Sequence, residues 1–192
     1  MRPCVLLVAL LTGACGSRPG NPVCGGLDFA GPATVRGIVT YGGMPVAAAL
    51  LGLGSSSAVT SSDGSFSIAS TPAGPQSLSI APTRAGRVSG EVSLLAGDNL
   101  LRIPVVRAAG EGIVAGRTID GCTGRPMGGV AVSIGAVSAT SDDDGLYELN
   151  GVCCGTLPPL RAHRAGYRTY RTTLGRVSTT SRWLDIVMLR SP

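Results

Sequence analysis

The chain has 192 residues, a length that allows one large domain or two small ones and excludes a multidomain enzyme. Its 29 glycines and 13 prolines separate stretches rich in valine, threonine, serine and isoleucine, which is typical of short strands joined by turns. All 16 basic residues are arginines, and the net charge of +5 is shared with 11 acidic residues, so general nucleic-acid binding is not expected.

The first 15 residues have the pattern of an export signal. Arg2 supplies a positive start, residues 5–11 form an apolar run, and small residues precede Cys15. The run is too short to span a bilayer. The segment Leu11-Thr12-Gly13-Ala14-Cys15 resembles the lipobox of bacterial lipoproteins, in which the cysteine is acylated and becomes the first mature residue. Thr12 stands where that family usually has leucine, so an ordinary secretory signal is the alternative.

The resemblance implies a signal peptide over residues 1–14 and a lipid anchor on Cys15. Each buried methylene of an acyl chain adds about 0.8 kcal/mol of membrane affinity, so more than one chain gives stable anchoring. Gly16 follows the cysteine, which resembles the outer-membrane address of Gram-negative lipoproteins. We therefore expect an exported protein, lipid-anchored in the outer membrane on its periplasmic or cell-surface face, with residues 15–33 as a flexible tether.

The mature chain contains an internal repeat. A shift of 81 residues places Asp63-Gly64 on Asp144-Gly145 and Phe66 on Tyr147, and further turn glycines and apolar positions match at the same offset. The apolar positions alternate, so they predict strands with one buried face. The strand after each Asp-Gly turn is expected to carry Phe66 or Tyr147 toward the core. The pattern predicts strands over 34–39, 49–53, 76–80 and 100–106 in the first copy, and over 112–118, 130–134, 160–163 and 183–189 in the second.

Several turn motifs point to one fold family. They are Gly37-Ile38-Val39 with Pro45, residues 62–66 and the turn at residues 72–74 in the first copy, and residues 125–132, 143–147 and 165–167 in the second. They resemble the carboxypeptidase regulatory-like domain, a transthyretin-like sandwich. The resemblance implies an all-β chain with two tandem Greek-key, transthyretin-like seven-stranded β-sandwiches over residues 34–106 and 112–192, joined by a linker at 107–111. It implies no activity.

Four cysteines lie in the mature chain beyond the lipid site: Cys24, Cys122, Cys153 and Cys154. In an oxidising compartment they predict two disulfides, with three pairings open. Cys122 and the Cys153-Cys154 pair are additions of the second copy, which favours pairing Cys122 with one of them and Cys24 with the other. A metal site that adds His163 is disfavoured because adjacent cysteines lack the usual C-x-x-C spacing. No cofactor is expected.

Catalytic motifs are missing from the sequence. His163 is its only histidine, so the two-histidine zinc site of metallocarboxypeptidases is lacking, and no Gly-x-Ser-x-Gly elbow is present. The run Asp142-Asp143-Asp144-Gly145 lacks the spaced ligands of a calcium loop and is interpreted as an acidic hairpin turn. The sequence therefore predicts a protein that is not an enzyme.

Arginines and aromatic residues interleave near the C-terminus. If this stretch is a strand, Arg168 and Tyr170 share one face, while Tyr167, Thr169 and Arg171 share the other. Such a surface can hold phosphate or carboxylate groups of an envelope polysaccharide, lipopolysaccharide or a partner protein, with its aromatic rings stacking on sugars. Solvated edge charges that prevent aggregation are the simpler interpretation. The candidate ligand residues are Arg161, Arg164, Tyr167, Arg168, Tyr170 and Arg171. We expect a structural, adhesion or protein-interaction role at the cell envelope, with carbohydrate binding through the second domain as the alternative.

Overall fold

The computed structural model describes residues 27–81, 87–105, 112–152, 156–175 and 181–192. These residues form sixteen strands and no helix, which confirms the predicted all-β sandwich class. Within this part of the chain, no segment qualifies as a membrane-spanning helix. The predicted signal peptide, the lipid site at Cys15 and the linker at 107–111 lie outside the described residues.

The first half of the chain forms two sheets that pack face to face. Its strands are β1 (Pro32–Tyr41), β2 (Met44–Pro45), β3 (Leu50–Leu53), β4 (Ser56–Val59), β5 (Ser65–Pro72), β6 (Gly74–Ile80), β7 (Val88–Leu94) and β8 (Gly97–Pro104). In one sheet, β1 pairs with β5 on one side and in parallel with β8 on the other, and β2 pairs with the end of β1. The other sheet has the order β4-β3-β6-β7.

The second half repeats this arrangement. Its strands are β9 (Gly112–Asp120), β10 (Ala131–Ile134), β11 (Val137–Thr140), β12 (Leu146–Val152), β13 (Leu160–His163), β14 (Tyr170–Thr172), β15 (Ser181–Leu184) and β16 (Ile186–Met188). The central strand β9 pairs with β12 and, in parallel, with β15 and β16. The facing sheet has the order β11-β10-β13-β14.

The strand bounds and register show how the two copies correspond. β3 and β4 coincide with β10 and β11 when the chain is shifted by 81 residues. Gly37 lies opposite Phe66, and Gly116 lies opposite Tyr147. The offset between the copies is therefore two residues smaller for β1 and β9 than for the later strands, because the second copy has a two-residue insertion, Gly121-Cys122, after β9. A Cβ on either glycine would lie under 2.5 Å from a backbone oxygen of the neighbouring parallel strand. Both aromatic side chains are buried, as predicted.

Each half has its own hydrophobic core. The first core lies between the two sheets of the first half and includes Leu51, Phe66 and Leu101. The second core includes Val132, Tyr147 and Leu160. Tyr147 also donates a hydrogen bond from its hydroxyl to the Leu184 carbonyl at 2.8 Å, and burial raises the pKa of Tyr147 well above its ordinary value. The aromatic position of each copy therefore anchors the middle of its sandwich.

A parallel strand pair joins the two halves. β15 of the second half pairs with β7 of the first, so a single eight-stranded sheet runs through the molecule. Trp183 lies opposite Gly90, where a Cβ would meet the Trp183 carbonyl oxygen at 2.3 Å. The Trp183 side chain belongs to the first core, although it comes from the second half. The glycine therefore allows the close strand approach that brings this indole into the first half.

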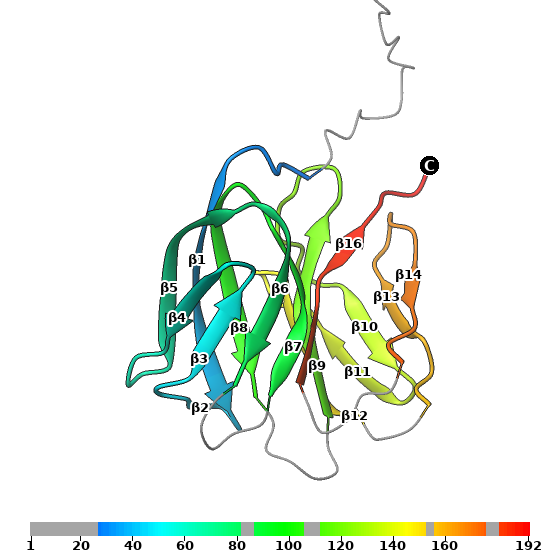
Figure 1. Ribbon diagram of the computed structural model, residues 1–192. Helices are drawn as coiled ribbons and strands as arrows, with labels where there is room; N and C mark the ends of the chain where they lie inside the picture. The colour runs from blue at the N-terminus through cyan, green and yellow to red at the C-terminus, as the bar shows by residue number, and fades with distance from the viewer. Residues whose placement is uncertain (1–26, 82–86, 106–111, 153–155, 176–180) are drawn as a thin grey trace, which may run out of the picture.

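The central sheet of the second half is buried on both faces. In β9, Val114 contributes to the second core and Ala115 to the first. In β12, Tyr147 contributes to the second core and Leu146 to the first. In Figure 1 the first half lies on the left, the sheet of β10, β11, β13 and β14 lies on the right, and β9 lies between them. One sheet thus separates two cores and closes the open side of the first sandwich.

A buried ion pair reinforces the junction. Arg117 and Asp185 lie 3.0 Å apart, with only 5% and 3% of their side chains exposed. Asp185 also accepts hydrogen bonds from the Ser93 amide at 2.8 Å and the Trp183 indole at 2.9 Å, and Arg117 donates to Asn99 at 3.3 Å. Because Ser93 and Asn99 belong to the first half, these polar contacts tie the two halves together. A buried pair of this kind adds little net stability, but removal of one partner leaves an uncompensated buried charge.

Candidate functional site

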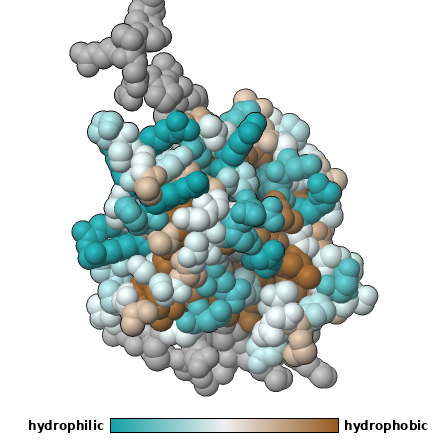
Figure 2. All heavy atoms as spheres, turned by 180° about the vertical axis from the view of Figure 1, so that it is seen from behind, coloured by the Kyte–Doolittle hydropathy of each residue, from teal (hydrophilic) through white to brown (hydrophobic). Residues whose placement is uncertain are grey.

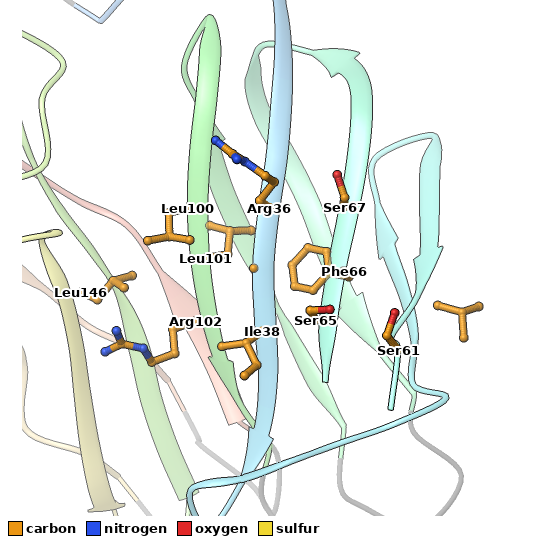
Figure 3. Close-up of a pocket in the computed structure, with 12 residues that line it drawn as sticks. Arg36, Ile38, Ser61, Ser65, Phe66, Ser67, Leu100, Leu101, Arg102 and Leu146 are labelled. Atoms are coloured by element: carbon orange, nitrogen blue, oxygen red, sulfur yellow. The ribbon is translucent and has the colours of Figure 1, made fainter. Parts of the chain in front are cut away.

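The outer face of the sheet β5-β1-β8 carries a groove of about 560 Å³. Ile38 and Leu100 contribute apolar surface, and Ser65 and Ser67 contribute hydroxyl groups. Figure 3 shows Leu100 and Arg102 projecting from β8 toward Leu146 of the second half. Leu100 is 48% exposed and adds to the apolar lining of the groove. Seen from behind, the molecule has brown apolar patches between hydrophilic side chains (Figure 2).

This face corresponds to the face that the second half uses to contact the first. The register pairs Arg36 with Leu100 in the first half and Ala115 with Trp183 in the second. Trp183 is 2% exposed because the first core covers it, whereas Leu100 at the equivalent position is open to solvent. The groove is therefore the uncovered counterpart of a face that, in the second half, packs against the other half of the chain.

Two arginines flank the groove, each beside an aspartate. Arg36 lies 3.2 Å from Asp98, and Arg102 lies 3.0 Å from Asp142 of the second half. All four side chains are at least 40% exposed, so these pairs contribute little to stability. The arginines can therefore exchange their partners for the carboxylates of a bound molecule at small cost.

Sequence reasoning missed this groove, although the repeat contains a signal for it. Leu100 and Ile38 read as ordinary strand residues in an alternating pattern. Their significance follows only from their counterparts, because Trp183 and Arg117 occupy the equivalent register positions in the second half. An alignment of the first and last strands of each copy, with the insertion taken into account, would have placed these residues on one face.

Two of the six predicted ligand residues make contacts within the protein. Arg164 donates a hydrogen bond to the Gly128 carbonyl at 2.7 Å and lies over the Tyr167 ring, 5.8 Å from its centre. Tyr167 donates its hydroxyl hydrogen to Asp120 at 2.7 Å. Residues 168 and 169 are outside β14, so regular alternation begins only at Tyr170.

The other four predicted residues divide into one partly buried and three exposed side chains. Tyr170 packs against the second core. Arg161, Arg168 and Arg171 are exposed, and none of them makes an ion pair or side-chain hydrogen bond with another described residue. Arg161 and Arg171 lie directly opposite each other on β13 and β14. The exposed part of the predicted surface is therefore basic, with its aromatic rings turned inward.

The remaining candidates for chemistry have structural surroundings. His163 is exposed on β13, with its Nδ1 3.5 Å from the Thr169 hydroxyl. Asp142 accepts a hydrogen bond from the Leu146 amide at 2.8 Å, which agrees with the interpretation of the acidic run as a turn. In the first copy, hydrogen bonds from the Ser65 hydroxyl and amide lower the pKa of Asp63. These contacts order the two hairpin turns.

The predicted disulfide pairing stays a prediction. Cys122 follows β9 in a turn where its amide donates a hydrogen bond to Asp120 at 2.8 Å. Cys24, Cys153 and Cys154 lie outside the described residues.

No family model matches this chain, and none of the curated proteins matches its sequence. Among solved structures, the TIE protein of Bacillus anthracis aligns with 83% of the chain at 11% identity and a TM-score of 0.36. The alignment covers 34% of that protein, so the chain spans about a third of its length. The shaft pilin SpaA of Lactobacillus rhamnosus GG aligns over 84% of this chain and 98% of its own, at 11% identity and a TM-score of 0.31. The minor pilin GBS52 of Streptococcus agalactiae aligns over 85% and 97%, at 14% identity and a TM-score of 0.32. Likeness at this level supports no conclusion about what the chain does.

Proposed function

We propose that this chain is a non-enzymatic interaction module of the cell envelope, with a structural or adhesive role. The observation that carries the proposal is the groove on β5-β1-β8. The equivalent face of the second half packs against a β-sandwich, so this fold can use that face as a protein interface. In the first half this face is open to solvent at Leu100, which is 48% exposed. Exposed apolar surface with a polar rim is typical of interaction sites.

The chemistry of the groove favours a polypeptide partner. Leu100 and Ile38 offer contacts to an apolar anchor side chain, and the flanking Arg36 and Arg102 suit acidic residues on either side of it. The groove is continuous with the junction between the two halves, because Leu146 belongs to both. A partner bound there would contact both halves at once, and the buried Arg117–Asp185 pair would hold the two parts of its binding surface in place.

Site-specific photo-cross-linking on intact cells tests the groove. A photoreactive amino acid at position 100 is expected to capture a discrete protein partner. The matched control is position 50, because Leu50 is 55% exposed on the opposite sheet of the same half. Equal capture at both positions, or no capture at position 100, would contradict the proposal.

We further propose how the chain is located and organised. The chain is exported and anchored in the outer membrane through acylated Cys15, and residues 34–106 and 112–192 are two transthyretin-like sandwiches. The shared strand order of the two halves supports the proposal of two sandwiches. Labelled palmitate is expected to enter the wild-type protein but not Cys15→Ala, and the wild-type protein should fractionate with membranes. Unchanged labelling or a soluble wild-type protein would contradict the anchor.

The complete lack of lysine offers a second test of the anchor. The only primary amine of the mature chain is its α-amino group, which an N-acyl chain on Cys15 would block. An amine-reactive dye should therefore leave the denatured mature protein unlabelled. Stoichiometric labelling would contradict N-acylation.

Carbohydrate binding through the second half is the second candidate function. It is favoured by the exposed side chains of Arg161, Arg168 and Arg171. A pull-down on envelope polysaccharides, repeated with Arg168→Glu and Arg171→Glu, tests it. Absence of binding to any polysaccharide would remove this candidate and leave the groove unaffected.

A further inference from the structure

Two arginines face each other on the outer surface of the second half. Arg161 of β13 and Arg171 of β14 are direct partners in the antiparallel register, and both side chains are exposed. Directly opposed residues have Cβ atoms about 4.5–5.5 Å apart, and like charges in such positions repel. The strands of this sheet, β10, β11, β13 and β14, contain no acidic residue. Nothing within the sheet therefore compensates the two positive charges.

The first half shows that the fold does not need arginines at these positions. Val132, Ala162 and Tyr170 are register partners across β10, β13 and β14. Their counterparts in the first half, Leu51, Ile80 and Val88, are register partners across β3, β6 and β7 in the same order. The arginine pair lies next to Ala162 and Tyr170, and the pair Ser79 and Ser89 lies next to Ile80 and Val88. Ser79 is therefore the counterpart of Arg161, and Ser89 is the counterpart of Arg171. These two serines also lie directly opposite each other.

The register neighbours of the pair are a serine, a histidine and an alanine. Ser133 lies opposite Arg161 on β10, His163 is two residues along β13 on the same face, and Ala131 lies opposite His163. A strip without a large apolar side chain is a poor protein interface. It suits an extended chain of sugars that presents anionic groups at intervals, since guanidinium groups bind phosphate, sulfate and carboxylate oxygens through paired hydrogen bonds.

We propose that Arg161 and Arg171 form an anion-binding subsite for an acidic polysaccharide. The two guanidinium groups bind one phosphate, sulfate or carboxylate group between them, and this anion relieves their mutual repulsion. The inference rests on the second candidate function, which it narrows from carbohydrates in general to acidic ones. It assigns recognition to charge rather than to stacking, because Tyr167 and Tyr170 are turned toward the protein.

Binding of the full-length protein to sulfated dextran, with unmodified dextran and inorganic phosphate as further arms, tests the subsite. The variant Arg161→Ser/Arg171→Ser restores the residues of the first half and should lower the affinity for sulfated dextran about tenfold or more. The control Arg87→Ser/Arg125→Ser removes two exposed arginines elsewhere, changes the net charge equally, and should lower affinity less than about threefold. Unmodified dextran should not bind, and phosphate should compete weakly.

Several outcomes would overturn the subsite. These are an equal loss in both double variants, no binding of the parent protein, or equal binding of unmodified dextran. The melting temperature of Arg161→Ser/Arg171→Ser provides a second measurement, and it should equal or slightly exceed that of the parent because a repulsion is removed. A marked decrease would assign the pair a structural role and would also overturn the proposal. Envelope polysaccharide that is retained equally by the parent and this variant would leave carbohydrate binding standing and remove only this subsite.

Discussion

Replacing Asp185 with asparagine should strongly destabilise the junction between the two halves. The carboxylate of Asp185 faces the buried Arg117 and accepts five hydrogen bonds, three from Arg117 and one each from Ser93 and Trp183. Asparagine has nearly the same shape, but it carries no charge and has only one acceptor oxygen. The substitution therefore leaves a buried guanidinium without a counter-charge and turns an amide donor toward other donors.

The expected loss in the free energy of unfolding is about 3–5 kcal/mol, which is typical for removing one partner of a buried ion pair. A lost hydrogen bond to a buried donor costs about 1–3 kcal/mol, so the unpaired donors alone would account for such a loss. Because small proteins are stable by only about 5–15 kcal/mol, the variant should unfold at a much lower denaturant concentration.

Urea unfolding followed by fluorescence measures this loss directly, because Trp183 is the only tryptophan and lies in the junction. The control Asp98→Asn breaks the exposed pair with Arg36 and should cost about 0–1 kcal/mol. In the double variant Arg117→Met/Asp185→Asn, the loss should be smaller than the sum of the two single losses. A loss in the free energy of unfolding below about 1 kcal/mol for Asp185→Asn, or strictly additive losses in the double variant, would refute the conclusion that this ion pair holds the two halves together.

Three further predictions concern stability and titration. Gly90→Ala should destabilise the protein by about 1–3 kcal/mol in thermal unfolding, because its Cβ would press on Trp183, whereas the neighbouring Ser89→Ala should have little effect. Burial raises the pKa of Asp120, but hydrogen bonds from Tyr167 and two turn amides outweigh burial and lower this pKa below 3.8. In an NMR titration, Tyr167→Phe should therefore raise the pKa of Asp120. Because the folded-state pKa of Asp120 is depressed, ionised Asp120 stabilises the folded protein above about pH 3.8, and this stabilisation is lost at more acidic pH. The loss of stability caused by Tyr167→Phe should therefore be smaller in acid than at neutral pH. A loss that is the same at every pH would contradict this assignment. In an alkaline absorbance titration, Tyr147 should ionise last among the tyrosines, together with unfolding; its ionisation in the native protein near pH 10 would contradict its burial.

Much of the fold could be predicted from the sequence. Alternating apolar residues and turn glycines indicated the strands, and the bounds of β13 agree with the prediction. Phe66 and Tyr147 were assigned to the two cores for the right reason, because each follows a tight Asp-Gly turn on an alternating strand. β7 was not predicted, because Gly90 interrupts its apolar pattern. That glycine has a tertiary reason, since it makes room for Trp183.

The candidate sites were less predictable because a strand pattern reports which face is buried, not what covers it. Arg117 and Arg161 both lie on strands of the second half, yet one is buried beside Asp185 and the other is exposed. The difference depends on the parallel pairing of β7 with β15, which joins segments about ninety residues apart in sequence.

Local sequence patterns are sufficient to predict the all-β class, the repeat and the turns, because these depend on local periodicity and on glycine conformation. Tertiary structure decided how the two halves join, and so left the groove around Leu100 open while it covered Trp183. It also decided which arginines face solvent. The physical reason is that burial of the second face of a sheet, and the pairing of charges across it, are set by contacts between distant segments that no local pattern records.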